Sequence, residues 1–277
     1  MFLDRRPHSI DPLPPGYREL LGRLLDVAAA DERVRAVWLG GSAARGAADA
    51  GSDLDVILAV ADEAFGEFAA GWRGWLGRVT PTVLARQLPG MPGSWYSLTP
   101  GCERLDVVTE RASAYPGRAS RNGELVLDKD GSFGRPAGQP GTPETAASPD
   151  PARLVAIVEE FLRQQAIFPA AVVARSDWLL GVQGVQGVHL MLYELFVESN
   201  QPLPPMGVKQ WSAKLTPAQR ECCAELQPPR AERQSVIDAM AAAAGAFRGQ
   251  ARQILAEHGA PWPGELDDAV LAYLSGK

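Results

Sequence analysis

Two short stretches decide the fold of this chain: residues 38–42, Trp-Leu-Gly-Gly-Ser, and, after ten further residues, residues 53–57, Asp-Leu-Asp-Val-Ile. The second continues as an apolar, β-branched run, which predicts a strand over 54–60. Because side chains alternate along a strand, Asp53 and Asp55 point the same way, and Leu54 points to the opposite face. Two adjacent carboxylates repel each other unless a cation lies between them, and Mg²⁺ with oxygen ligands fills that role.

The turn before these acids predicts a phosphate-binding site. Residues 34–39 predict a strand that ends at Gly40, and a turn there exposes backbone N–H groups of Gly41 and its neighbours. Such a turn can cradle phosphate, with Ser42 supplying a hydroxyl.

A third acid, Asp106, interrupts the apolar run of residues 104–108. An Asp in a strand suited to burial needs a partner. A metal shared with Asp53 and Asp55 is one partner, and a buried pair with Arg104 or another Arg is the alternative.

The rest of the first half alternates between helix and strand patterns. The predicted helical segments are 15–30, 43–50 and 62–76; the predicted strands are 34–39, 54–60, 82–88, 95–98, 104–108 and 124–127. The strands 95–98 and 104–108 form a hairpin around Pro100-Gly101.

The second half carries helix patterns only. It follows a stretch rich in Pro and Gly, and its predicted helices begin near Pro151 and Thr216 or span 170–199, 230–258 and 263–274. We therefore expect an α+β chain: an N-terminal mixed-sheet domain (1–135), a linker (136–149) and an all-helical C-terminal domain (150–277).

Bulk properties exclude several classes. The chain has 277 residues, a net charge of −6 and three cysteines without a metal-ligand spacing. The acidity argues against a nucleic-acid backbone as the main ligand, and the unpaired cysteine count favours a reducing compartment. No apolar run is long enough for a membrane span, and residues 1–15 do not read as a signal peptide, so we expect a cytoplasmic protein with no membrane partner.

The Gly-Gly-Ser turn, the ten-residue spacer, the Asp-Leu-Asp strand and the later Asp106 resemble the nucleotidyltransferase superfamily of DNA polymerase β-like fold. The Asp-Lys-Asp-Gly turn at 128–131 and the all-helical second half resemble its antibiotic-modifying branch, the aminoglycoside and lincosamide nucleotidyltransferases. The resemblance implies that the first domain is a nucleotidyltransferase domain and the helical domain binds substrate. The implied reaction transfers a nucleoside monophosphate, usually AMP from ATP although another NTP could serve, to a hydroxyl with release of pyrophosphate.

The resemblance also implies roles for individual residues. Asp53 and Asp55 would bind Mg²⁺, and Asp106 would be a third metal ligand or the general base. The remaining expected roles concern the nucleotide: Gly41 and Ser42 hold the triphosphate, and Arg45 and Lys209 reach its phosphates. The alternative for Arg45 is a solvated helix residue, and the alternative for Lys209 is a solvated cap anchored by Trp211. His189 and Tyr193 share a helix face, and either line a binding cleft or belong to the core.

The expected acceptor is a small hydroxylated molecule in the interdomain cleft, such as an aminoglycoside or lincosamide antibiotic, which implies a role in antibiotic resistance. A protein-modifying enzyme of a toxin–antitoxin pair, which adds AMP to its partner, would use the same acids; the long helical domain disfavours it. A non-catalytic homologue that only binds a nucleotide or ligand is disfavoured because all three acids are present.

Overall fold

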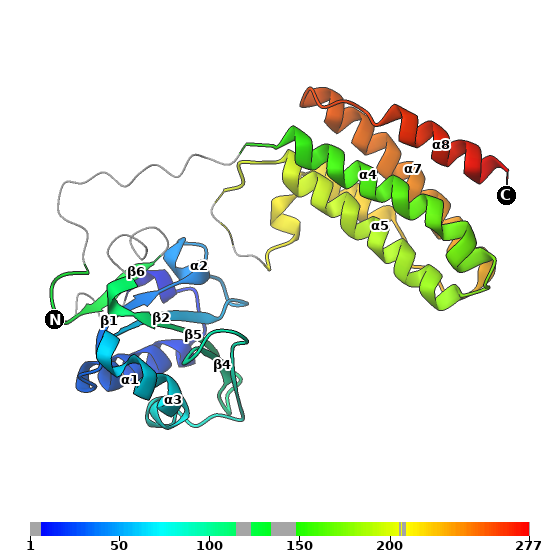
Figure 1. Ribbon diagram of the computed structural model, residues 1–277. Coiled ribbons are helices and arrows are strands. Elements are labelled where there is room, and N and C mark those ends of the chain that lie inside the picture. The colour runs from blue at the N-terminus through cyan, green and yellow to red at the C-terminus, as the bar shows by residue number, and fades with distance from the viewer. Residues whose placement is uncertain (1–6, 115–122, 134–147, 205, 207–208, 277) are drawn as a thin grey trace. The chain divides into compact units, whose positions relative to one another are not determined.

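The computed structural model describes residues 7–114, 123–133, 148–204, 206 and 209–276 (Figure 1). The chain forms two compact units: Met1–Glu144 with Pro205–Gln210, and Thr145–Pro204 with Trp211–Lys277. The short segment Pro205–Gln210 thus belongs to the first unit, whereas the predicted boundary placed it in the helical domain. Most of the predicted linker, residues 136–147, lies outside the described residues. The predicted α+β class, a mixed sheet followed by helices, is confirmed.

The first unit is built on a six-stranded mixed sheet in the order β3-β4-β5-β2-β1-β6. β2 pairs antiparallel with β1 on one side and parallel with β5 on the other. The strands are β1 (Val34–Leu39), β2 (Leu54–Val60), β3 (Leu84–Gln87), β4 (Trp95–Leu98), β5 (Arg104–Arg111) and β6 (Glu124–Asp128).

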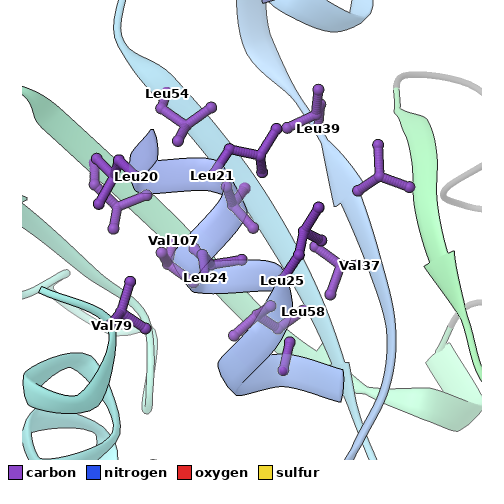
Figure 2. Close-up of a cluster of buried hydrophobic side chains, with 14 of the residues drawn as sticks. Leu20, Leu21, Leu24, Leu25, Val37, Leu39, Leu54, Leu58, Val79 and Val107 are labelled. Atoms are coloured by element: carbon purple, nitrogen blue, oxygen red, sulfur yellow. The ribbon is translucent and has the colours of Figure 1, made fainter. Parts of the chain in front are cut away.

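Two helices, α1 (Pro15–Ala30) and α3 (Phe65–Val79), pack against the sheet. Their buried side chains and those of the strands together form the main core of this unit. Figure 2 shows Leu20, Leu21, Leu24 and Leu25 of α1 packed among valines and leucines of the central strands. These leucines recur at helical spacing and are at most 1% exposed. Because this face of the sheet is covered, every second residue of β2 and β5 is buried there, and the residues between them point away.

Two predicted helices of this unit have different bounds. The predicted helical turn at 43–50 is α2 (Gly41–Ala44), because Gly46 adopts a positive φ of 65° that ends it. The predicted helix at 62–76 begins as a 3-10 turn (Asp62–Ala64) and continues as α3 to Val79.

The Asp-Lys-Asp-Gly turn after β6 holds the end of the sheet. The buried Asp128 carboxylate accepts hydrogen bonds from the backbone N–H groups of Asp130, Gly131 and Phe133. Lys129 donates to the Asp31 carbonyl, so the turn ties the strand end to the end of α1. The turn is therefore a structural element of the edge of the sheet.

The second unit contains helices and short turns only. Its helices are α4 (Pro151–Phe168), a π-helical turn (Pro169–Val173), α5 (Trp178–Ser199), a 3-10 turn (Ser212–Lys214), α6 (Pro217–Glu225), α7 (Arg233–Glu257) and α8 (Gly264–Ser275). Phe161 of α4 stacks on Phe247 of α7 with ring centroids 4.0 Å apart, in a core of leucines and valines. Within the described residues, no helix is long and apolar enough to cross a membrane.

The predicted continuous helix over 170–199 is wrong in its first turns. The chain leaves the helix after the π turn, and Ser176 adopts a positive φ of 54°. A new helix then starts because the Asp177 side chain accepts a hydrogen bond from the backbone N–H of Leu180 at 3.0 Å.

Candidate active site

The turn between β1 and α2 is shaped around Asp55. The Gly40 N–H donates to the Asp55 carbonyl at 2.9 Å, and Gly41 adopts a positive φ of 56°. A Cβ atom at Gly41 would overlap the Asp55 carboxylate, so only glycine fits this position without moving the acid. The buried Ser42 Oγ has no hydrogen-bond partner among the described residues. A buried hydroxyl without a partner at a turn of this kind is free to bind a ligand oxygen.

The sheet brings the three predicted acids together. Asp55 of β2 and Asp106 of β5 are register partners on adjacent parallel strands, so their side chains lie side by side on one face. Asp53 directly precedes β2, two residues before Asp55 and on the same face. Figure 1 shows β2 and β5 side by side at the centre of the sheet. The predicted convergence of the three acids is therefore what the register produces.

Two cations lie close to Asp53. The Lys209 Nζ donates to Asp53 Oδ2 at 2.6 Å, and the Arg104 Nη1 lies 3.9 Å from the same oxygen. Arg104 also donates to the Gly51 carbonyl. Among the described residues Arg104 forms no ion pair with Asp106 and acts on it only through its charge, so the alternative of an Arg104–Asp106 pair is wrong.

Burial and mutual repulsion change the titration of the acids. Burial, together with the charges of Asp53 and Asp106, raises the pKa of Asp55 to about 6. Burial, followed by the charge of Asp53, also raises the pKa of Asp106. No hydrogen bond to either carboxylate offsets this effect within the described residues. The site therefore holds more negative charge than its own residues neutralise.

This raised pKa predicts a gain in stability when the charge is removed. A carboxyl that holds its proton more tightly in the folded chain than in the unfolded chain stabilises the fold while protonated. That contribution is lost as the pH rises from the ordinary value of 3.8 through about 6. Asp55→Asn should therefore raise the Tm by about 2–4 °C at pH 7.5, measured in a chelator, and by less at pH 4.

The matched control for this experiment is Asp268→Asn, which removes an exposed acid of α8. Its Tm should follow the wild type at both pH values. A Tm for Asp55→Asn below the wild type at pH 7.5 would mean that the carboxylate is a stabilising group, contrary to its raised pKa.

An open cavity of about 380 Å³ lies beside the acids. It contains the predicted phosphate-binding residues and the two acids of the first motif, and its described lining is Gly41, Ser42, Arg45, Asp49, Gly51, Ser52, Asp53, Asp55, Lys209 and Gln210. Asp106 is not part of this lining and belongs to the site through its pairing with Asp55. Every other predicted site residue lines one cavity of the first unit.

Sequence reasoning missed Asp49, Gln210 and the site role of Arg104. The Asp49 carboxylate accepts hydrogen bonds from the Gly51 N–H at 2.9 Å and the Ser52 hydroxyl at 3.0 Å, which closes the loop before Asp53. Gln210 donates to the other Asp49 oxygen at 2.6 Å. Lys209 and Gln210 therefore both bind the loop at residues 49–53. The Asp-x-Gly-Ser pattern at 49–52 was the available signal, because Asp in that position closes a turn.

The chemistry of the donor set fits a magnesium ion, since all three acids offer oxygen ligands and their charges are incompletely neutralised. Within the described ranges, no group of three or more His, Cys, Asp or Glu side chains is already arranged to hold a metal. Lys209 supplies the cation closest to Asp53.

Residues 16–83 match the family model described as "Streptomycin adenylyltransferase", and this match confirms the predicted resemblance for that segment. The matched segment runs from α1 to the turn before β3 and includes Ser42, Asp53 and Asp55; it does not include Asp106 or Lys209.

An aminoglycoside 6-adenyltransferase from Bacillus subtilis is among the solved structures that are similar to this chain. It is 18% identical, the alignment covers 92% of this chain and 95% of that one, and the TM-score is 0.41. No curated protein sequence matches the chain.

Proposed function

We propose that this chain is a Mg²⁺-dependent adenylyltransferase that transfers AMP from ATP to a hydroxyl of a small acceptor, with an aminoglycoside such as streptomycin as the first candidate. The observation that carries the proposal is the in-register pair Asp55–Asp106 beside the Gly41–Ser42 turn. The family match of residues 16–83 supports adenylyl transfer and, through the name of that family, an antibiotic acceptor.

The triphosphate would bind at the glycine-serine turn. The Gly41 backbone and the unpartnered Ser42 hydroxyl offer hydrogen-bond donors, and Arg45 and Lys209 line the same cavity with positive charge. In this position the turn fixes the orientation of the nucleotide, and the two cations offset the charge of its phosphates. Asp53 and Asp55, with Asp106 as a third candidate, would hold Mg²⁺, which when bound neutralises charge on the attacking and leaving oxygens.

Asp106 is the residue we assign to the acceptor side. In the reaction the acceptor oxygen forms a bond to the α-phosphorus, the bond from that phosphorus to the bridging oxygen breaks, and pyrophosphate leaves. The hydroxyl proton needs an acceptor, and a carboxylate whose pKa is raised by burial is a stronger base than an exposed one. Asp106 fits this role because it lies beside Asp55 but outside the cavity that the phosphates would fill.

The direct test incubates the protein with Mg²⁺, α-labelled ATP and a panel of antibiotics that includes streptomycin, other aminoglycosides and lincosamides. We expect a labelled adduct and stoichiometric pyrophosphate with at least one of them. Replacing ATP by GTP, CTP or UTP tests the preference for the nucleotide. Pyrophosphate release without an adduct, or no product with any nucleotide, would contradict the proposal.

Lys209 offers a test of nucleotide binding. Its ammonium contacts Asp53, and it is 60% exposed, so Lys209→Met should not unfold the chain. If Lys209 also meets the phosphates, this variant should raise KM for ATP about tenfold, the size expected for the loss of about 1.4 kcal/mol. Lys209→Arg should recover part of the loss, and Lys214→Met, which removes a lysine outside the cavity lining, should leave KM unchanged. An unchanged KM in Lys209→Met would mean that Lys209 pairs with Asp53 and does not bind the phosphates of ATP.

A further inference from the structure

The helical unit has a cavity of its own, of about 400 Å³, which lies within the range of small-molecule sites. One wall is a single face of α5, where Gln186, His189, Leu190 and Tyr193 follow one another at helical spacing. The opposite wall comes from the segment after Gln210 and from α6. None of the adenylyltransferase site residues contributes to it.

A flat aromatic surface forms part of this cavity. Tyr193 and Trp211 stack with ring centroids 4.3 Å apart and an angle of 13° between their planes. The Tyr193 hydroxyl donates to the Trp211 carbonyl at 3.4 Å, which helps to fix the pair. Trp211 nevertheless remains 52% exposed, and Leu190 beside it 44% exposed. Large apolar side chains gathered in a cavity and left this exposed are typical of a ligand site.

The cavity is also without formal charge. Of the described residues that line it, none is Asp, Glu, Lys or Arg. Burial lowers the pKa of His189 and raises those of Tyr193 and Cys223, so all three side chains are neutral at pH 7. A charged group placed there would lose water and gain no counter-charge, which costs free energy. Gln186 and Ser212 offer neutral hydrogen bonds instead.

We propose that this cavity binds an uncharged small molecule with a flat, mostly apolar ring system, stacked against the Trp211–Tyr193 pair. Its size suits a ring system with a few substituents, and the aromatic pair offers an offset-stacking surface. The described lining offers no carboxylate to pair with a polycationic amino sugar. The proposal is independent of adenylyl transfer, because no residue of that site is part of the cavity.

Three probes with one ring system and different charges test the proposal: naphthalen-2-ylmethanol, the naphthalen-2-ylmethylammonium ion and naphthalene-2-carboxylate. Equilibrium dialysis against the full chain at pH 7, without ATP or Mg²⁺, gives the three affinities. We expect the neutral alcohol to bind, and the ammonium and the carboxylate each to bind at least about tenfold more weakly, since the three probes share the ring system and differ mainly in the charge of their substituent.

Two variants locate the site. Leu190→Glu places a carboxylate in the cavity at a half-exposed position, and should weaken binding of the alcohol about tenfold without unfolding the helix. The matched control is Leu271→Glu, because Leu271 of α8 is 43% exposed and does not line the cavity. Trp211→Ala removes the stacking surface and should weaken binding by a similar factor.

Far-UV circular dichroism establishes that each variant is folded. The inference would be overturned if the alcohol did not bind, if the ammonium ion bound as tightly as the alcohol, or if Leu190→Glu bound like Leu271→Glu. A wild-type affinity for the alcohol in Asp55→Asn would separate this site from the nucleotide site, and loss of that affinity would contradict their independence.

Discussion

Asp55→Asn should lower the rate of adenylyl transfer by roughly 10³-fold or more, the size seen when a group that stabilises transition-state charge is removed. The substitution keeps the shape of the side chain and removes one negative charge from the position where Asp53, Asp55 and Asp106 meet. Asn is a weaker metal ligand than Asp and leaves the phosphates without the charge balance that the site provides. Single-turnover rates with the acceptor found in the antibiotic panel give the measurement.

The stability of the same variant distinguishes the loss of a catalytic group from a loss of the folded structure. Asp55→Asn is expected to be inactive and yet at least as stable as the wild type at pH 7.5, because it removes a charge whose burial, together with repulsion from Asp53 and Asp106, raises the pKa of Asp55. Asp268→Asn, which removes an exposed acid of α8, should keep full activity. Activity within tenfold of the wild type in Asp55→Asn would remove Asp55 from the proposed mechanism.

The effect of Mg²⁺ on thermal stability tests the same site without a measurement of activity. A metal that binds the folded chain only should raise the Tm of the wild type, and the increase should depend on its concentration. In Asp55→Asn the increase should be much smaller. An equal increase in both proteins would show that Mg²⁺ binds elsewhere.

Asp267→Ala should destabilise the helical unit by about 3–5 kcal/mol, the range found when one partner of a buried ion pair is removed. The Asp267 side chain is 2% exposed and accepts hydrogen bonds from Arg248, from Arg252 at 2.9 Å and from the Trp262 indole at 3.0 Å. It therefore joins α7, the loop before α8 and α8 itself. Without it, the guanidinium of Arg248, whose side chain is only 18% exposed, would lose its counter-charge.

Urea unfolding followed by far-UV circular dichroism measures this loss, and the Trp262 environment can be followed by fluorescence. Asp268→Ala, at the neighbouring exposed position, is the control and should change the free energy of unfolding by about 0.5 kcal/mol or less. A loss below about 1 kcal/mol in Asp267→Ala would mean that the arginines find other partners or water.

The elements predicted best are those whose pattern is dictated locally. The helix at 15–30 and the strands at 34–39 and 54–60 have the bounds expected from the sequence. In each, apolar residues recur at the period of the element, and glycine, proline or aspartate stands at its ends. The meeting of Asp53 and Asp55 was predictable for the same reason, since alternation along a single strand decides it.

The features that sequence reasoning missed depend on long-range contacts. Gln210 donates a hydrogen bond to Asp49, which lies 161 positions earlier in the chain, and no local sequence pattern indicates that contact. The start of α5 was missed because its apolar periodicity extends backwards through residues that leave the helix, and the capping role of Asp177 was overlooked. The aromatic cavity depends on Trp211 lying against Tyr193, 18 positions earlier, whereas the sequence left His189 and Tyr193 open between cleft and core.

The parallel pairing of β2 with β5 determines which changes of sequence would keep Asp106 beside Asp55. Asp106 faces Asp55 because of its place in the alternation of β5, and the number of residues between the two acids does not matter to that geometry. Loops in the intervening stretch can lengthen or shrink, but a single-residue slip within β5 would bury the acid and turn Val107 outward. The position of Asp106 within β5 therefore decides whether it meets Asp55, and the length of the chain between the two strands does not.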